Sequence, residues 1–242
     1  MRCGDGEVVV TAMLDWEANK RGKTMGMRRG VFLAGLAAVM LGGCVQNGQL
    51  SPTSDANWSQ RDRQLLANPP YAKASIPQEY QRHIVDYQRH EAPGTIVVDT
   101  GSKYLYYVLP KGQAIRYGVT VGEEGQSWSG VARVGNKTEW PSWTPTEGEK
   151  QRLGHLPNFV PGGNANPMGA RALYLYAGGR DTQYRIHGTN QPEYIGQAIS
   201  SGCIRLTNED IIDLYNRAKV GTPVVVLPAS VYSMRSADNS MR

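Results

Sequence analysis

The chain has 242 residues and a formal net charge of +5, with 40% hydrophobic and 19% charged residues. This length fits one domain of ordinary size with extra segments at its ends. The mild positive charge comes without a dense run of Lys and Arg, so it does not indicate a nucleic-acid-binding surface. Three widely spaced cysteines do not form a disulfide framework, and the four histidines lack metal-ligand spacing. We therefore expect no metal and no cofactor.

Residues 25–44, MGMRRGVFLAGLAAVMLGGC, have the order of a secretory signal: two arginines, a short apolar run and small residues. The ending LGGC resembles a bacterial lipobox, in which Cys44 is lipidated and becomes the first residue of the mature protein. Val45 then follows, in place of the Asp that usually signals inner-membrane retention. We expect an exported, periplasmic protein anchored to the outer membrane. The alternatives are ordinary cleavage near Gly43 or a retained signal anchor. Residues 1–24 are interpreted as a non-native upstream extension.

Residues 45–92 combine a polar tether with one short helix. Scattered Pro, Ser and Asn in residues 45–70 are typical of a flexible tether. In residues 77–92 the spacing of Tyr80, Ile84 and Tyr87 places these side chains on one helical face.

From residue 93 the sequence changes to β-rich runs. Six of them predict strands, the first three as an antiparallel meander: 95–100, 103–109, 115–122, 170–178, 183–189 and 222–227. Residues 122–168, rich in Gly, Pro and Trp, predict a functional flap without strong periodicity. Within and beside this segment, Trp140, Trp143 and Tyr174 are candidates to line a cleft, although packing in the core or flap is the more common role of such residues.

One helix is predicted after the last cysteine. Thr207 and Asp210 fit the start of a capped helix, and Gly221 ends it. The sequence thus predicts a mostly β domain at residues 93–228, followed by a C-terminal tail at residues 229–242.

The stretch RIHGTNQPEYIGQAISSGCIR contains His187 and, sixteen positions later, Cys203. A free thiol is mostly protonated at neutral pH, so a nucleophilic cysteine needs a base or a positive neighbour that lowers its pKa. A strand ending at His187 and a tight turn through Ser200 would bring the two side chains together. The N–H groups of Gly202 and Cys203 would then converge as an oxyanion hole. A buried cysteine and a core histidine form the alternative, and spacing alone does not decide between them.

The pattern of His187-Gly-Thr, the spacer and Ser201-Gly-Cys-Ile-Arg resembles the signature of the YkuD-type L,D-transpeptidases, in their ErfK/YbiS-like branch. The resemblance covers roughly residues 94–228. It implies a β-sandwich or β-barrel catalytic domain with a short helix after the cysteine. In such an enzyme, Cys203 attacks the bond between residue 3 and D-Ala of a peptidoglycan stem tetrapeptide. His187 takes the thiol proton and passes it to D-Ala, and the main-chain carbonyl of Gly188 orients the ring.

The resemblance further implies that an amine resolves the acyl-enzyme, either on another stem peptide or on an outer-membrane protein. Arg205, Ser200 and Ser201 are expected to hold the loop or a substrate carboxylate. The family's usual GTPTPxGxF segment is replaced by GVARVGNKTEWPSWTPTEG, which leaves the acceptor open.

Other classes of protein share parts of this pattern. With water as acceptor, the enzyme would be an L,D-carboxypeptidase. If the protein catalyses no reaction, it would be a wall-binding lipoprotein. A sortase has its arginine further from the cysteine, and papain-like and NlpC-type peptidases have the cysteine before the histidine. Both of these are therefore disfavoured.

Overall fold

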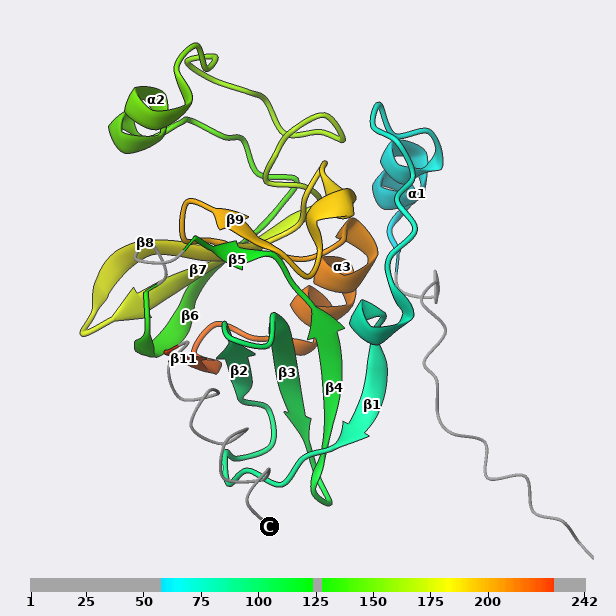
Figure 1. Cartoon of the computed structure of the whole chain (residues 1–242), viewed down its shortest axis with the longest axis vertical. Coiled ribbons are helices and arrows are strands. Elements are labelled where there is room, and N and C mark those ends of the chain that lie inside the picture. Colours follow the sequence, from blue (N-terminus) through cyan, green and yellow to red (C-terminus); the bar gives the residue numbers. More distant parts are fainter. Residues whose placement is uncertain (1–57, 124–127, 229–242) are drawn as a thin grey trace, which may run out of the picture. The chain divides into compact units, whose positions relative to one another are not determined.

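The computed structural model describes residues 58–123 and 128–228, and strands dominate them (Figure 1). The mostly β fold expected from the sequence is confirmed. The predicted signal with Cys44 and the tail at 229–242 lie outside the described residues. Within the described part of the chain, no helix has the length and apolar character needed to cross a membrane.

Nine strands of the described residues form one mixed sheet. They are β1 (His83–Asp86), β2 (Ile96–Asp99), β3 (Tyr104–Leu109), β4 (Gln113–Gly118), β6 (Gly130–Glu139), β7 (Arg171–Ala177), β8 (Arg180–His187), β10 (Ile204–Arg205) and β11 (Pro223–Leu227). Their order is β1-β4-β3-β2-β11-β6-β7-β8-β10, and β5 (Val121–Gly122) pairs separately with β9 (Ala198–Ser200). Strands β2, β3 and β4 form the predicted antiparallel meander. Strand β11 joins this group to β6, β7 and β8 (Figure 1).

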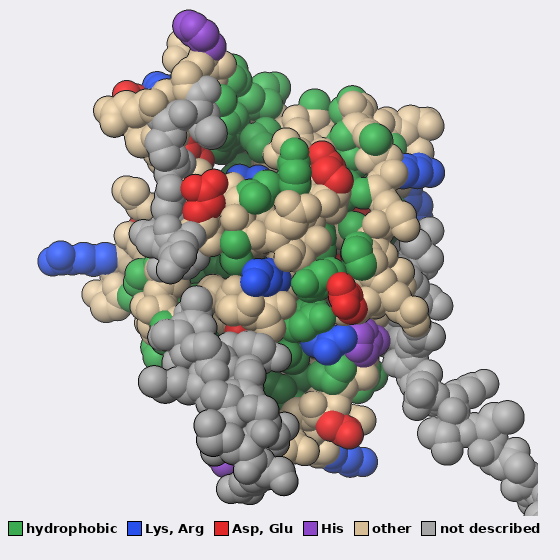
Figure 2. Space-filling view, in the orientation of Figure 1, with side chains coloured by type: hydrophobic (Ala, Val, Ile, Leu, Met, Phe, Trp, Pro, Cys, Tyr) green, Lys and Arg blue, Asp and Glu red, His purple; other side chains and the backbone are tan. Residues whose placement is uncertain are grey.

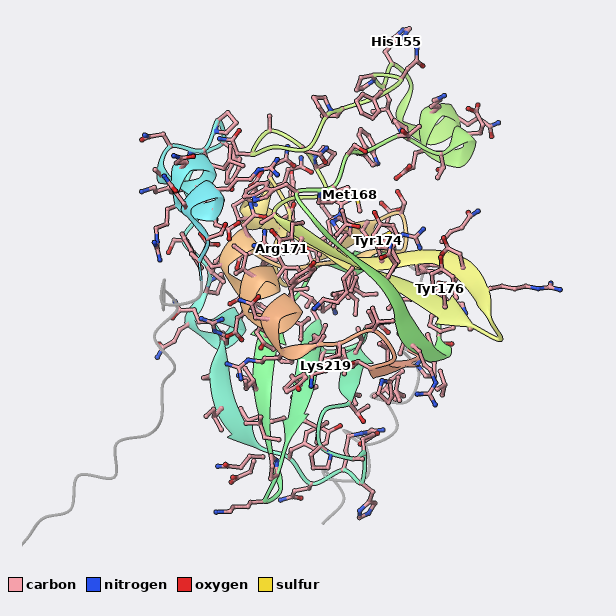
Figure 3. All side chains as sticks on the ribbon, turned by 180° about the vertical axis from the view of Figure 1, so that it is seen from behind. His155, Met168, Arg171, Tyr174, Tyr176 and Lys219 are labelled. Carbon is pink, nitrogen blue, oxygen red and sulfur yellow. The ribbon has the colours of Figure 1, made fainter. Side chains whose placement is uncertain are left out.

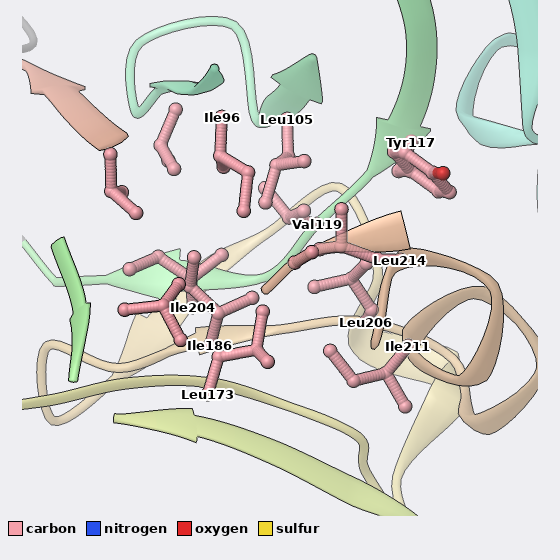
Figure 4. Packing of buried hydrophobic residues seen from close by; sticks show 14 of the residues in the cluster. Ile96, Leu105, Tyr117, Val119, Leu173, Ile186, Ile204, Leu206, Ile211 and Leu214 are labelled. Carbon is pink, nitrogen blue, oxygen red and sulfur yellow. The ribbon is translucent and has the colours of Figure 1, made fainter. Parts of the chain in front are cut away.

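The sheet does not close into a barrel, because β1 and β10 are its two unjoined edges. Instead, the two groups of strands pack face to face on a common core, as in a sandwich (Figure 4). Full burial of each large aliphatic side chain contributes roughly 1.5–3 kcal/mol. The core side chains from both groups of strands and from α3 (Asn208–Arg217) include Ile96, Leu105, Tyr117, Leu173, Ile186, Ile204, Ile211 and Leu214.

The helix predicted after the last cysteine is confirmed as α3. The Thr207 side chain accepts a hydrogen bond from the Asp210 N–H at 3.2 Å, which caps the first turn. Ile211 and Leu214 face the core, so the apolar face of α3 is held against the sheet.

The N-terminal segment differs from the prediction. Helix α1 (Gln60–Ala67) lies where the sequence indicated a tether, and Ser59 caps it through reciprocal hydrogen bonds with Asp62. The helix predicted over residues 77–92 is wrong: a 3₁₀ turn, η2 (Gln78–Tyr80), leads into β1. Pairing of β1 with β4 satisfies main-chain groups along β4 that β3 leaves free, and this tertiary contact outweighs the helical spacing.

Residues 122–168 are also more regular than expected. They contain β6, in which buried Ala132 and Val134 alternate with exposed residues, and α2 (Glu147–Leu153). The flap is therefore residues 141–168. Trp143 and Val160 close its base with two main-chain hydrogen bonds of 2.9 and 2.8 Å, and the part carrying His155 stands away from the sheet (Figure 3).

Candidate active site

Strands β8 and β10 lie side by side and parallel, with Ile186 opposite Ile204 and His187 opposite Arg205. Side chains alternate between the two faces of a strand. Ile186 and Ile204 are buried in the core, so the alternate positions His187 and Arg205 turn to the other face. Cys203, immediately before β10, lines the same pocket as His187 and Arg205. The local strand pattern thus brings together the histidine and the cysteine that are sixteen residues apart in the sequence.

His187 and Cys203 both line one pocket of about 380 Å³. The flap forms a second wall through Trp143, Glu149 and Met168, while Tyr174 comes from β7. Met168 and Tyr174 lie near each other on the strand side of this wall (Figure 3). Of the three aromatic candidates, Trp143 and Tyr174 line the pocket, whereas Trp140 is buried and donates a hydrogen bond from Nε1 to Asp62.

A hydrogen bond to the main chain and burial fix the orientation of the His187 ring. Its Nδ1 lies 2.6 Å from the carbonyl oxygen of Gly188, and the side chain is almost fully buried. A neutral ring that donates from Nδ1 keeps the lone pair of Nε2 as its basic site. Burial, followed by the positive charge of Arg205, lowers the pKa of His187 from 6.5 to about 3, although the main-chain groups of Gly188 and Met168 oppose this shift.

The thiol of Cys203 does not have the lowered pKa that a pre-ionised nucleophile requires. Burial raises the pKa of Cys203, and a hydrogen bond from the main chain of Arg185 together with the positive charge of Arg205 offsets only part of the rise. The side chains of the free protein are thus a neutral thiol and a neutral imidazole. An ion pair could form only during attack on a substrate.

Ser200 fixes the turn before Cys203. Its hydroxyl donates to the carbonyl of Cys203 at 2.6 Å and accepts from the N–H of Gly202 at 3.2 Å. Gly202 has a φ of 118°, which favours glycine. In this conformation the Gly202 N–H is already engaged, so it can serve an oxyanion only after releasing Ser200. Ser201 also lines the pocket.

Four charged side chains line the pocket. Arg185 pairs with Asp181 at 2.7 Å and lies over the ring of Tyr174, 4.4 Å from its centroid. Main-chain hydrogen bonds of 2.9 Å in both directions with Thr120 hold Arg205 in place. The buried Nε of Arg205 has no hydrogen-bond partner among the described residues, which suits a carboxylate that enters with a ligand.

This strand-and-turn arrangement coincides with a known catalytic domain. The model of the YkuD L,D-transpeptidase catalytic domain matches residues 93–226. The chain belongs to the YkuD family. It is 34% identical over 207 residues to the Escherichia coli protein named Probable L,D-transpeptidase ErfK/SrfK, covering 80% of this chain and 64% of that one. It is 39% identical over 155 residues to Probable L,D-transpeptidase YbiS of the same organism, covering 60% and 48%.

Among solved structures, a Brucella melitensis protein described as a probable carnitine operon oxidoreductase is 44% identical. That match covers 63% of this chain and 96% of that chain with a TM-score of 0.42. The matched part of the chain spans about half to two thirds of the length of the two curated Escherichia coli relatives, ErfK/SrfK and YbiS.

Some residues around this YkuD site were not found by sequence reasoning. Glu149 and Asp181 line the pocket, while Asn208 and Asp62 make buried hydrogen bonds to Ala170 and Arg171, at the start of β7. The capping pattern Ser59-x-x-Asp62 was a readable signal for α1. Nothing in the sequence marked Asn208. Among the described residues, no group of three or more His, Cys, Asp or Glu side chains is placed to hold a metal ion.

Proposed function

We propose that the protein is a peptidoglycan L,D-transpeptidase, with Cys203 as nucleophile and His187 as general base. The observation that carries this proposal is that a thiol and an imidazole line one pocket, in a chain of the YkuD family. The Gly188 carbonyl holds the imidazole in one tautomer.

The reaction has two half-steps. First, the sulfur of Cys203 attacks the carbonyl carbon of the residue 3 to D-Ala bond, while Nε2 of His187 takes the thiol proton. The tetrahedral intermediate collapses, its C–N bond breaks, and His187 gives the proton to the departing amine of D-Ala. Second, an acceptor amine attacks the thioester, His187 takes one of the amine protons, and that proton returns to the sulfur as the C–S bond breaks. The N–H of Cys203, joined by that of Gly202 once it releases the Ser200 hydroxyl, would bind the oxyanion.

Arg205 connects substrate binding to the strength of the base. Burial of the His187 ring has the largest effect on its pKa, and the positive charge of the Arg205 guanidinium lowers this pKa further. A substrate carboxylate that pairs with Arg205 would cancel this repulsion and allow His187 to accept the thiol proton more readily. Stem peptides carry such carboxylates, so their binding would activate a base that stays neutral in the free enzyme.

The location of the enzyme is part of the same proposal. We place it in the periplasm, exported by the signal at residues 25–44 and anchored to the outer membrane through lipidated Cys44. The acceptor is then an amine of a neighbouring stem peptide or of an outer-membrane protein. Water as acceptor would make the same site an L,D-carboxypeptidase.

The test uses residues 45–242, the part of the chain that follows the predicted lipobox cysteine, with a purified disaccharide-tetrapeptide and mass spectrometry. A dimer formed with loss of D-Ala, absent in Cys203→Ala and His187→Gln but present in His155→Gln, is the expected result. His155 is exposed and serves as a matched histidine control. Tripeptide alone would favour water or an absent protein amine as acceptor. No change in the substrate would sink the proposal and favour a wall-binding lipoprotein.

Arg205 has its own variant in this assay. Arg205→Lys keeps a positive charge but loses the two-pronged geometry that matches a carboxylate. We expect a higher KM for the tetrapeptide with soluble, folded protein. An unchanged KM would assign Arg205 to holding the loop.

A further inference from the structure

Asn208, the first residue of α3, is buried and uses its whole side-chain amide. Its Oδ1 accepts a hydrogen bond from the N–H of Ala170 at 2.8 Å. Its Nδ2 donates to the carbonyl of Thr189 at 2.9 Å and to the hydroxyl of Tyr71 at 2.8 Å. One side chain thus connects the start of β7, the segment after His187 and the N-terminal segment.

Two hydrogen bonds hold the peptide units on either side of the one whose carbonyl orients His187. The carbonyl of Gly188 accepts from Nδ1 of His187. On one side of that carbonyl, the Gly188 N–H donates to Arg171 at 3.0 Å. On the other side, Asn208 holds the carbonyl of Thr189. The direction of the Gly188 carbonyl is therefore set by Arg171 and by Asn208.

The side-chain amide of Asn208 packs tightly against the main chain of two glycines. A Cβ atom on Gly188 would collide with Oδ1 of Asn208 and would lie 2.9 Å from the nitrogen of Ala170. A Cβ on Gly169 would collide with the same oxygen. The glycine that follows His187 is thus required by the position of Asn208.

Asn208 does not reach the reacting groups directly. It lines a separate cavity of about 460 Å³, together with Tyr71 and Thr189, and not the pocket that holds Cys203. Any effect on catalysis must therefore pass through the Gly188–Thr189 peptide.

We propose that Asn208 is the positioning residue that keeps Nε2 of His187 available as a base, by fixing the carbonyl that receives the Nδ1 proton. Without the amide, the Gly188 carbonyl turns, the ring loses its fixed tautomer, and Nε2 no longer faces the thiol with a lone pair. This inference rests on the proposed function for its kinetic consequence, but not for its prediction about the ring.

The kinetic test compares Asn208→Ala and Asn208→Asp with wild type. Asp keeps the shape, the acceptor for Ala170 and a favourable charge in the first turn of α3, but it lacks the donors. Both variants should lose about 100-fold in kcat per titratable thiol, since small misplacements of catalytic groups have effects of this size. KM should stay within about twofold, because Asn208 is outside the substrate pocket. Asn216→Ala, an exposed asparagine of the same helix, serves as the matched control.

The second readout is the ¹⁵N chemical shift of the His187 ring in labelled protein, assigned with His187→Gln. Wild type should show a protonated Nδ1 and an unprotonated Nε2, and both Asn208 variants should show a mixture of tautomers. Wild-type kcat in the variants, or a loss of kcat with an unchanged tautomer, would overturn the proposal. If the wild type leaves the tetrapeptide unchanged, the proposed function fails separately, and the ¹⁵N shifts still decide the role of Asn208.

Discussion

Removal of the Asp62 carboxylate should destabilise the whole catalytic domain. Asp62 is fully buried and receives two charged hydrogen bonds from Arg171, at 2.9 and 2.7 Å. Trp140 and Ser59 supply further donors. Asp62→Ala would leave the buried guanidinium of Arg171 with only the exposed Glu139, 3.7 Å away, as a charged partner, and loss of a buried partner typically costs about 3–5 kcal/mol. For a chain of this size, the melting temperature should then fall by roughly 6–20 °C.

The assay is urea unfolding followed by circular dichroism, with Asp62→Ala, Arg171→Met and the double variant. The double variant should recover part of the loss, because it removes both charges. Glu147→Ala breaks the exposed ion pair with Lys150 and should change the free energy of unfolding by less than about 1 kcal/mol. A loss below about 1 kcal/mol for Asp62→Ala would refute the reasoning, since α1 would then not be part of the folded domain.

This contribution also depends on pH. Burial alone would raise the pKa of Asp62, but hydrogen bonds from Arg171 and Ser59 outweigh it and hold the pKa below its ordinary value of 3.8. The stabilisation is therefore fully present above pH 3.8 and is lost as the pH falls through the lower pKa of the folded state.

Three further predictions concern the pocket. The pKa of His187 falls from 6.5 to about 3 on folding, so the free energy of unfolding should decline as the pH drops through that window. The decline should be smaller in His187→Gln, and the same pH profile in both proteins would contradict this. Because burial raises the pKa of Cys203 above its ordinary value of 9.0, alkylation by iodoacetamide should be slow at neutral pH and should accelerate only above pH 9.0. An alkylation rate that is already fast and constant below pH 7 would indicate a pre-formed thiolate. Gly188→Ala should cost about 1–3 kcal/mol of stability and most of the activity, through the collision with Asn208. In Gly148→Ala the new methyl meets nothing within 4 Å, so an equal effect there would discount the packing argument.

The sequence predicts the strands and the central residues of the pocket better than their surroundings. His187 and Cys203 could be brought together by a strand, a loop and a small-residue turn, but it was the resemblance to the YkuD signature that favoured the pair over two core residues. Helix α3 was readable from its cap at Thr207 and its apolar face. These features are local, and local propensity and periodicity report them.

The missed features depend on contacts between distant residues. Strand β1 forms because β4 offers an open edge, although the spacing of Tyr80 and Ile84 favours a helix. Strand β6 has only a brief alternation, and a register shift between Val134 and Asn136 interrupts its pairing with β7. The raised pKa of Cys203 comes from burial, which no motif encodes.

The same limit applies to polar residues. Figure 2 shows cationic and anionic side chains interspersed on the visible face, as the composition suggested. Burial of Asp62 and Asn208, in contrast, follows only from the assembled fold. A polar residue near the start of a helix is usually a solvent-exposed cap, and sequence alone gives no reason to place it under the active site.

The position of β11 constrains when this domain can exist during synthesis. This strand lies in the middle of the sheet, parallel to β2 and antiparallel to β6, yet it is the last strand of the described chain. Within this sheet of the described residues, β11 alone joins the meander to the strands that carry His187, so these sheet hydrogen bonds form only once residues 223–227 are made. The bonds of Thr120 with Arg205 and the pairing of β5 with β9 connect the two groups elsewhere. A sheet whose central strand is made last should fold slowly, because segments far apart in the sequence must pair before the core is complete.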